Sequence, residues 1–346
     1  MTNSKICIVG DRHFGIGSDI FLESQINFDY KVLMPYLKNN EIDTVIFPGD
    51  IFDNRKSLNV YVKNKVYDLF CEYEKLGINI YISLGNHDTY FKNTNEINSL
   101  KWLEKFNNVK IYGGIEKTKI KNKTFLFVGW QHDLNEYINY VTSNDVEDIN
   151  VCVGHFDIIG AKMSGTIMSN IGLTKNYVMR FPLVFSGHYH SMSIEKNNKS
   201  QLIYVGTPYQ LTRGDKNESK YFFVLDLENM QYNMIENIKS IRFVDVFYPE
   251  KTTKEETNNN IIDLHIPENV DIDELETYKE EIRSYEPISI TPRIISKAKT
   301  EDKKEIKFKS LKELFFEYVT SIDIEDSLKE KTTQKINNLF DEFYSE

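Results

Sequence analysis

Five of the seven histidines in this 346-residue chain lie in a set of five short turns, three of which carry aspartate or asparagine. In chain order, the turns read DRHFG at 11–15, GDIFD at 49–53, GNHD at 85–88, GH at 154–155 and GHYH at 187–190. One such turn has a high false-positive rate, because a lone histidine is more often packed or solvated than a ligand. Five together provide the carboxylate, amide and imidazole groups that a two-metal phosphoesterase site requires.

The ligand types indicate which ions such a site would hold. Oxygen and nitrogen donors without thiolates suit hard or borderline divalent ions and do not indicate a structural zinc site. We expect Mn²⁺ in preference to Mg²⁺, because imidazole is a poor ligand for Mg²⁺. Two ions about 3.5–4 Å apart can polarise a phosphodiester and share one bridging carboxylate. Asp50, which follows a glycine at a predicted strand end, is the natural bridge.

Each turn follows a short apolar run that is rich in β-forming residues. The runs are 6–9, 45–47, 80–82, 151–153 and 183–185. Open α/β sheets place ligand sites beyond the carboxyl ends of their strands. The sequence therefore predicts that all five turns converge on one crevice.

The alternation of helical and strand patterns predicts the fold class. Apolar residues recur at helical spacing over 28–37, 60–76 and 97–106, while 117–130 is typical of a β-hairpin. From residue 183 onward, strand patterns follow one another with polar turns between them. We therefore expect an α/β fold, in which a two-sheet sandwich flanked by helices covers residues 1–238.

The remaining residues predict smaller units. Residues 239–296 contain a β-α-β pattern (261–266, 272–285, 288–295), which we interpret as a small α+β cap domain. Residues 297–309 are highly charged and indicate a linker. Residues 310–346 indicate a tail of two amphipathic helices, which either fold back on the chain's own surface or bind another protein. The apolar stripes of the tail include Leu311, Leu314, Phe315, Tyr318, Leu339, Phe340 and Phe343.

Composition and charge set outer limits. With 40% hydrophobic residues the chain can bury a sizeable core, and without a run of about 18 apolar residues we expect a cytoplasmic location and no membrane. The net charge is −10, but residues 239–346 hold 17 Lys and Arg against 25 Asp and Glu. The acidity thus lies mostly in residues 239–346, and charge permits a DNA partner. Cys7, Cys71 and Cys152 are expected to be reduced packing residues.

These motifs resemble a known family. The order Asp-x-His, Gly-Asp-x-x-Asp, Gly-Asn-His-Asp, Gly-His, Gly-His-x-His is that of the calcineurin-like metallophosphoesterases. GDIFDNR at 49–55 and GTPY at 206–209 make the chain similar to the SbcD-like nuclease subunit of double-strand-break repair complexes. Within that group it looks most like the recombination endonuclease subunit of large tailed phages, and the resemblance covers nearly the whole chain.

The resemblance implies roles for individual residues. One metal would be held by Asp11, His13, Asp50 and His190, and the second by Asp50, Asn86, His155 and His188. His87 would be the catalytic histidine that contacts the scissile phosphate without binding metal. Asp88 would orient His87 or, alternatively, cap a helix, and Asp53 would support a ligand. His132 and His265 have no counterpart in the motif.

The resemblance also implies a substrate and partners. The expected activity is that of a metal-dependent DNA exonuclease and endonuclease, gated by an SMC-like ATPase that binds the C-terminal helices of a homodimer within a heterotetramer. A phage-encoded chain would act in the host cytoplasm. One alternative is a metallophosphatase or phosphodiesterase acting on phosphoproteins or small phosphoesters, and another is a scaffold without activity. Arg12, Arg55, Lys56 and Arg213 lie near the turns as possible phosphate contacts, although each alone is more often a surface charge.

Overall fold

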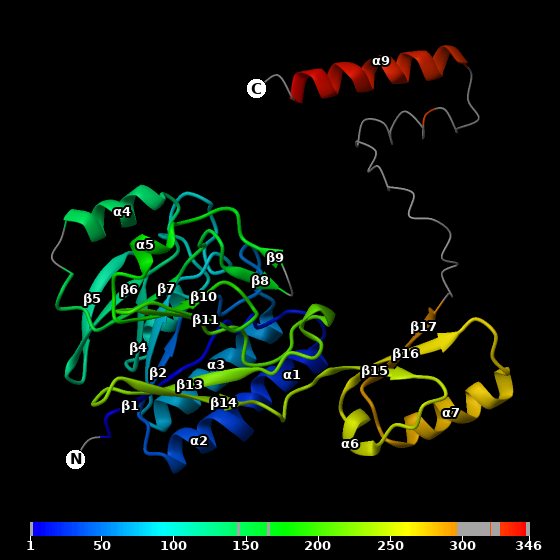
Figure 1. Cartoon of the computed structure of the whole chain (residues 1–346), viewed down its shortest axis with the longest axis horizontal. Coiled ribbons are helices and arrows are strands. Elements are labelled where there is room, and N and C mark those ends of the chain that lie inside the picture. The colour runs from blue at the N-terminus through cyan, green and yellow to red at the C-terminus, as the bar shows by residue number, and fades with distance from the viewer. Residues whose placement is uncertain (1–2, 144–145, 165–166, 296–318, 320–325, 344–346) are drawn as a thin grey trace. The chain divides into compact units, whose positions relative to one another are not determined.

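The computed structural model describes residues 3–143, 146–164, 167–295, 319 and 326–343. The chain divides into two compact units, Met1–Ile294 and Ile295–Glu346. The first unit contains two six-stranded sheets and a three-stranded sheet (Figure 1). The domain limits that we expect at residues 238, 296 and 309 stay predictions.

The first large sheet carries the amino-terminal strands. Its parallel part is β1 (Lys5–Ile8), β2 (Thr44–Phe47), β3 (Asn79–Ser83) and β4 (Val109–Tyr112). The antiparallel strands β13 (Tyr221–Asp226) and β14 (Gln231–Glu236) extend it beyond β1. Three of the five predicted turns thus follow adjacent parallel strands, β1, β2 and β3.

The second large sheet carries the other two turns. Its parallel strands are β6 (Lys123–Val128), β7 (Val151–His155), β10 (Leu183–Gly187) and β12 (Gln201–Tyr204). The antiparallel edge strands are β5 (Ile115–Ile120) and β11 (Ser193–Lys196). A short hairpin follows β7, formed by β8 (Lys162–Ser164) and β9 (Ile167–Met168).

The core explains why the strands are apolar on both faces. In β1, Ile6 and Ile8 pack between the two sheets, while Cys7 faces the helices on the outside. This alternation follows from the two-residue period of a strand, and burial of both faces is typical of parallel sheets that are covered by helices. The two-sheet sandwich predicted from the sequence is confirmed.

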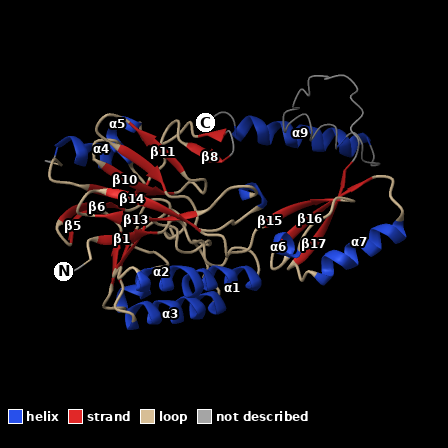
Figure 2. Ribbon diagram, turned by 60° about the horizontal axis from the view of Figure 1, so that its bottom comes forward, coloured by secondary structure: helices blue, strands red, loops and turns tan. Residues whose placement is uncertain are grey.

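Helices cover both outer faces (Figure 2). One face packs against a continuous helical run, α1 (Asp19–Phe28), a π-helical turn (Asp29–Leu33) and α2 (Met34–Asn39), and against α3 (Val60–Lys75). The other packs against α4 (Leu134–Ser143) and α5 (Lys175–Val178). The helix predicted over 28–37 is therefore only part of a longer one. The helix predicted over 97–106 is wrong in extent, because only Lys101–Lys105 forms a short 3₁₀ helix.

A separate small sheet follows the sandwich. Its order is β15 (Phe243–Phe247), β16 (Ile261–Pro267) and β17 (Ser289–Ile295), with α6 (Lys254–Thr257) and α7 (Ile272–Ser284) in the connections. The sequence prediction began at residue 261 and so missed β15, which pairs with β16 in parallel. We refer to residues 243–295 as the cap. Its own core includes Val246, Ile262, Leu264, Leu275 and Ile282.

The second unit contributes one described helix, α9 (Asp326–Phe343). Four predicted partner-binding residues lie outside the described residues, namely Leu311, Leu314, Phe315 and Tyr318. Leu339, Phe340 and Phe343 lie within α9, but the positions of their side chains are not described. Within the described part of the chain, every helix is too short or too polar to span a membrane.

Candidate metal centre

The five predicted turns meet at one place in the sandwich. The turns after β1, β2 and β3 contribute Asp11, His13, Asp50 and Asn86. His155 is the last residue of β7, and the turn after β10 contributes His188 and His190. Hydrogen bonds connect the turns of one sheet to those of the other. For example, the His188 backbone N–H donates to Asp11 Oδ2 at 2.8 Å. The carboxyl ends of the two sheets therefore form a shared crevice, as the sequence predicts.

One half of the crevice is formed by Asp11, His13 and His190. Their ligand atoms all lie within 4.8 Å of one another. His13 Nε2 is 3.0 Å from His190 Nε2 and 3.7 Å from Asp50 Oδ2. Two imidazole nitrogens at this separation can share one proton or face a common cation.

The other half is formed around Asn86. Its Oδ1 atom is 3.0 Å from His155 Nε2 and 3.1 Å from His188 Nδ1. His155 Nε2 is also 3.2 Å from Asp50 Oδ2. Asp50 Oδ2 is thus the oxygen that faces both halves, which is the arrangement a bridging carboxylate requires.

Outer contacts orient two of the imidazoles. Pro48 O lies 3.0 Å from His155 Nδ1, so Nδ1 donates its proton to this carbonyl and Nε2 is the nitrogen that could bind a metal. Asp53 Oδ1 lies 3.5 Å from His13 Nδ1. This is consistent with the supporting role expected of Asp53, which stays a prediction.

Burial and charge shape the protonation states of the crevice. Burial raises the pKa of Asp11 to about 6, and burial lowers the pKa of His190 to about 4 and of His188 to about 3. Burial also acts against ionisation of Asp50, but the neighbouring His155 outweighs it and holds the Asp50 pKa far below its usual range. His188 and His190 are therefore neutral at pH 7, the form in which histidine binds a metal.

Two buried polar atoms in the crevice lack hydrogen-bond partners. Asp11 Oδ1 and His13 Nδ1 are both shielded from solvent and make no hydrogen bond, although His13 Nδ1 faces the Asp53 carboxylate at 3.5 Å. Leaving such atoms unsatisfied costs about 1–3 kcal/mol each, so an arrangement of this kind needs a compensating contact. A donor set of carboxylates, an amide and imidazoles without a thiolate fits divalent cations of the Mn²⁺ or Mg²⁺ type. The residues present therefore fit the predicted metals.

The turns adopt strained backbone conformations that bring these donors together. His13, Asp50 and His188 have φ values of 44°, 49° and 92°, in the left-handed region that non-glycine residues rarely adopt. Strain of this kind clusters at functional sites. The glycine before Asn86 is also required, because a Cβ at Gly85 would overlap the Asp50 carboxylate.

His87 lies beside the donors but belongs to neither half. Its ring makes an edge-on contact with the His13 ring, with centroids 4.9 Å apart, and its backbone N–H donates to Asp50 Oδ1 at 2.8 Å. The ring Nδ1 is 2.5 Å from the Asp53 carbonyl oxygen, which fixes the proton on Nδ1. Nε2 is then the nitrogen left for a substrate.

Asp88 has a different role from the one we expect from sequence. Its fully buried carboxylate accepts hydrogen bonds from the backbone N–H groups of Gly85, Ile51 and Phe52, at 3.0, 3.0 and 3.3 Å. Asp88 therefore holds the turns after β2 and β3 together, while the Asp53 carbonyl orients the His87 ring. The alternative role, capping a helix, is not seen either, because the three N–H groups that donate to Asp88 come from two separate turns.

Arg12 is likewise not available to a phosphate. Its guanidinium is 1% exposed and ion-paired with the buried Asp29 from the π-helical turn. Tyr73 donates to Asp29 at 2.5 Å, and Tyr209 donates to the Arg12 carbonyl at 2.7 Å. This network anchors the turn that carries Asp11 and His13. Through Tyr209, the GTPY motif thus supports the turn that carries Asp11 and His13 and does not line the crevice itself.

Two further arginines in the turns are also engaged. Arg55 donates to the Asn86 carbonyl, and Arg213 binds Asp263 in the cap. Lys56 is exposed. His132 Nε2 pairs with Asn95 Oδ1 at 2.8 Å, so it is a satisfied side chain at the rim.

Sequence reasoning missed Asp157 and Trp130. Asp157 Oδ2 is 4.0 Å from His188 Nε2, and the Trp130 ring lies against His188 with centroids 5.2 Å apart. Both residues line a cavity of about 230 Å³ beside the crevice, together with His155 and Ile171. The position of Asp157, two residues after His155, was the available signal.

The fold and the site define a phosphoesterase, and comparison with known families agrees. Residues 4–192 match the family described as calcineurin-like phosphoesterase. This stretch covers more than half of the chain, so the chain belongs to that family of metal-dependent phosphoester hydrolases. The family membership and the enzyme class expected from the motifs are both confirmed.

Three named proteins are similar in sequence to this chain. Exonuclease subunit 1 of Enterobacteria phage T4 is 28% identical over 344 residues, which are 97% of this chain and 98% of that protein. Putative phosphoesterase 244L of Invertebrate iridescent virus 6 is 28% identical over 63% of this chain and 75% of its own length. A subunit of the nuclease SbcCD from Staphylococcus epidermidis is 27% identical over 66% of this chain and 67% of its own length.

Proposed function

We propose that this chain is a metal-dependent DNA nuclease with two divalent ions. The observation that carries the proposal is Asp50 Oδ2, which faces His155 on one side and His13 on the other at 3.2 and 3.7 Å. The first ion would be held by Asp11, His13, Asp50 and His190. The second would be held by Asp50, Asn86, His155 and His188. Bound divalent ions supply Lewis acidity for phosphodiester hydrolysis.

His87 is the proposed catalytic residue. The Asp53 carbonyl holds the proton on His87 Nδ1 and leaves Nε2 available to a substrate. A scissile phosphate that binds between the donors would meet His87 Nε2, which would contact the phosphate and, once protonated, donate its proton to the leaving oxygen. Asp53 supports both His13 and His87, whereas Asp88 maintains the backbone of the turns.

Mn²⁺ is the proposed preferred ion, with Mg²⁺ as the second choice. Four of the seven proposed ligands are imidazoles, and imidazole suits Mn²⁺ better than Mg²⁺. Carboxylate and amide oxygens complete each set without requiring a soft ligand. No thiolate belongs to either set, and Cys7 and Cys152 are buried elsewhere in the core.

DNA and an SMC-like ATPase are the proposed partners. The support is that two relatives of this chain are named as subunits, one of an exonuclease and one of the SbcCD nuclease. We propose residues 1–238 as the nuclease domain, 239–296 as the cap, 297–309 as a linker and 310–346 as the ATPase-binding tail. A homodimer within a heterotetramer that acts in the cytoplasm completes this proposal.

A nuclease assay tests the proposal. Metal-depleted full-length protein is incubated with linear duplex DNA and with Mn²⁺, Mg²⁺ or no metal, with and without the co-encoded ATPase and ATP. Metal-dependent cutting that the ATPase and ATP increase is the expected result. Rapid hydrolysis of p-nitrophenyl phosphate or cyclic nucleotides with DNA left intact would instead favour the alternative, an enzyme for small phosphoesters or phosphoproteins.

A further inference from the structure

A short turn lies between the metal ligand His190 and the cap. It consists of the 3₁₀ helix η3 (Arg213–Asp215) with Thr212 before it and Lys216 after it. The Asp215 carboxylate accepts hydrogen bonds from the backbone N–H groups of Leu211 and Thr212, at 3.1 and 2.8 Å. Thr212 and Asp215 form a reciprocal capping box, which fixes the turn as one rigid piece. We call residues 212–216 the junction turn.

On its inner side, the junction turn is bonded to the backbone of His190 through Lys220. Lys220 Nζ donates to Asp215 Oδ1 at 2.6 Å, to Glu218 Oε2 at 3.0 Å and to the His190 carbonyl oxygen at 3.1 Å. The Lys220 side chain is only 4% exposed. Because a buried ammonium needs partners in fixed places, the His190 backbone is held at a set distance from Asp215.

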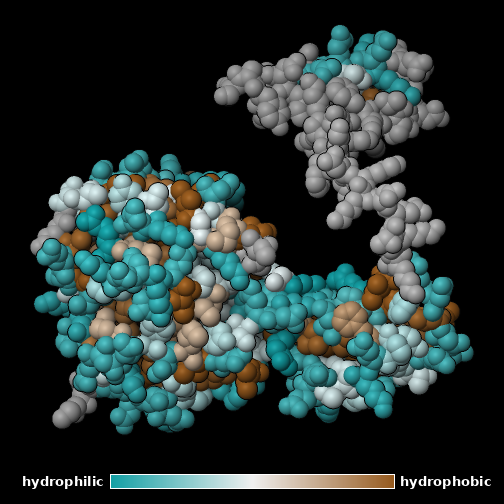
Figure 3. Space-filling view, in the orientation of Figure 1, coloured by the Kyte–Doolittle hydropathy of each residue, from teal (hydrophilic) through white to brown (hydrophobic). Residues whose placement is uncertain are grey.

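On its outer side, the junction turn holds the cap. Arg213 Nε binds Asp263 Oδ2 of β16 at 2.9 Å. Lys216 Nζ binds the same Asp263 oxygen at 2.9 Å and Asp245 Oδ1 of β15 at 2.7 Å. The two cations therefore join two cap strands to the turn that holds Asp215. Figure 3 shows that the surface where the cap meets the sandwich is mostly hydrophilic.

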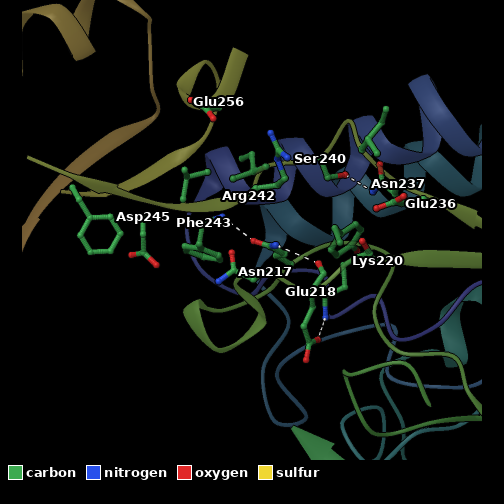
Figure 4. A pocket seen from close by; sticks show the side chains of 17 residues that line it. Asn217, Glu218, Lys220, Glu236, Asn237, Ser240, Arg242, Phe243, Asp245 and Glu256 are labelled. Carbon is green, nitrogen blue, oxygen red and sulfur yellow. Dashed lines mark hydrogen bonds and ion pairs between the residues drawn. The ribbon is translucent and has the colours of Figure 1, made fainter. Parts of the chain in front are cut away.

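A cavity separates the cap and the sandwich next to these contacts. It has a volume of about 600 Å³, and Lys220, Glu218, Asp245 and Arg242 are among its lining residues (Figure 4). Close packing at that place is thus incomplete. If the cap moved relative to the sandwich, the ion pairs of the junction turn would transmit the movement, because side chains do not fill the space beside them.

We propose that Lys220 is a positioning residue for His190 and that the junction turn couples the cap to the first metal site. The inference rests on the proposed metal centre. A pull on Arg213 or Lys216 from the cap moves Asp215, and Lys220 passes the displacement to the His190 carbonyl. His188 shares a turn with His190, but Asn86 and His155 belong to other turns, so the path reaches the first site directly and the second only through that shared turn. A nucleic acid or protein that displaces the cap would thereby alter metal affinity mainly at the first site.

The test measures Mn²⁺ binding to metal-depleted full-length protein by calorimetric titration, with electron paramagnetic resonance to count paired ions. Two variants interrupt the path at different ends, Arg213→Met/Lys216→Met at the cap and Asp215→Asn/Lys220→Met at His190. Lys220→Arg keeps a cation at position 220. The matched control is Lys254→Met, which removes a cap lysine from an exposed ion pair with Glu286.

Both double variants should weaken one Mn²⁺ site about tenfold or more, in the range typical of changes behind a metal ligand. The other site should be weakened less, and Lys254→Met should bind like wild type. Lys220→Arg should lose less affinity than Asp215→Asn/Lys220→Met, because it keeps the charge. Unchanged affinity at both sites in either folded double variant would overturn the coupling, as would equal weakening of both sites. Circular dichroism at the titration temperature confirms folding. If wild type itself binds fewer than two ions, the proposed function fails instead.

Discussion

Two buried charged clusters flank His190, and they are built on opposite principles. In the metal centre, like atoms face one another, with His13 Nε2 3.0 Å from His190 Nε2 and Asp11 Oδ1 without a partner. In the junction turn, opposite charges face one another, with Lys220 2.6 Å from Asp215. The first cluster leaves a buried carboxylate oxygen unpaired, whereas in the second each cation is paired with carboxylates.

This difference distinguishes a cluster that binds a ligand from a cluster that only holds the structure in place. A buried donor set with unpaired polar atoms stays destabilising until a ligand binds, so the folded state should gain stability from the metal. A cluster whose cations and carboxylates already pair with one another gains nothing from added metal and serves to fix geometry. The variants below act on one cluster or the other, and the contrast predicts different measurements for each.

The largest effect is expected from Asp50→Asn, which removes the charge that both halves of the metal centre share. The amide keeps an oxygen for the His87 backbone N–H but is a poor bridge between cations. Turnover on linear duplex DNA with Mn²⁺ should fall about 10⁴-fold or more, because several kcal/mol of transition-state stabilisation are lost. Mn²⁺ titration should show fewer than two bound ions. A variant that keeps both ions and its turnover contradicts the bridging role.

His87→Ala is expected to lower turnover without loss of metal. Loss of a group that transfers a proton costs about 10²–10⁴-fold in rate. The His87 ring belongs to neither donor set, so Mn²⁺ stoichiometry should stay at the wild-type value. Parallel measurement of turnover and of metal content by mass spectrometry separates the two readouts. Loss of both ions would show that His87 is a ligand and not a proton donor.

The junction turn is tested by Asp263→Asn and pH. Burial works against ionisation of Asp263, but Arg213 and Lys216 lower its pKa to about 2. The ionised form therefore stabilises the folded state above the unfolded pKa of about 4, and this contribution disappears as pH falls to about 2. At pH 7 the variant should be less stable by about 1–2 kcal/mol, a value reduced by solvent screening at the partly exposed Arg213.

Urea unfolding of wild type and Asp263→Asn between pH 7 and pH 2.5 measures this difference. The gap between the two proteins should narrow as pH falls below about 4. Asp273→Asn, at an exposed position in the first turn of α7, is the control and should show a smaller gap. A gap that persists unchanged to pH 2.5 would show that the Asp263 charge does not hold the cap.

The convergence of the five turns could be predicted because each turn follows the carboxyl end of a predicted strand. Parallel strands bring residues such as Asp50 and Asn86 to one edge whatever lies between them. The second sheet could be joined to the first only by the repeated glycine-histidine pattern at 154–155 and 187–190. Assignment of individual ligands to one ion or the other came from resemblance and remains a prediction.

The fates of Arg12 and Asp88 could not be predicted, because each depends on partners distant in sequence. Arg12 is neutralised by Asp29, which a π-helical turn places beneath the crevice. Asp88 adjoins His87 in the chain, but its carboxylate points to the backbone of another turn. A sequence pattern shows which groups are near along the chain, whereas burial and pairing are decided by packing.

The smallest effects are expected behind the imidazoles, where Asp53 and Asp157 provide a matched pair. Asp53 Oδ1 lies 3.5 Å from His13 Nδ1, and Asp157 Oδ2 lies 4.0 Å from His188 Nε2. Neither contact is a good hydrogen bond at these lengths, so each isosteric change to asparagine should weaken Mn²⁺ binding by less than the 10–100-fold typical of bonded partners. Asp53→Asn should have the larger effect, and at the first site.

Asp157→Asn should act on the second site, where His188 and Asn86 lie. The Asp157 carboxylate also accepts hydrogen bonds from Tyr189 and Ser169, so its orientation is fixed from behind. Tyr189→Phe removes one of these bonds and should produce a smaller shift in the same direction. Calorimetric titration that resolves the two Mn²⁺ sites provides the measurement. If Asp157→Asn weakened the first site instead, the division of the crevice into two donor sets would be wrong.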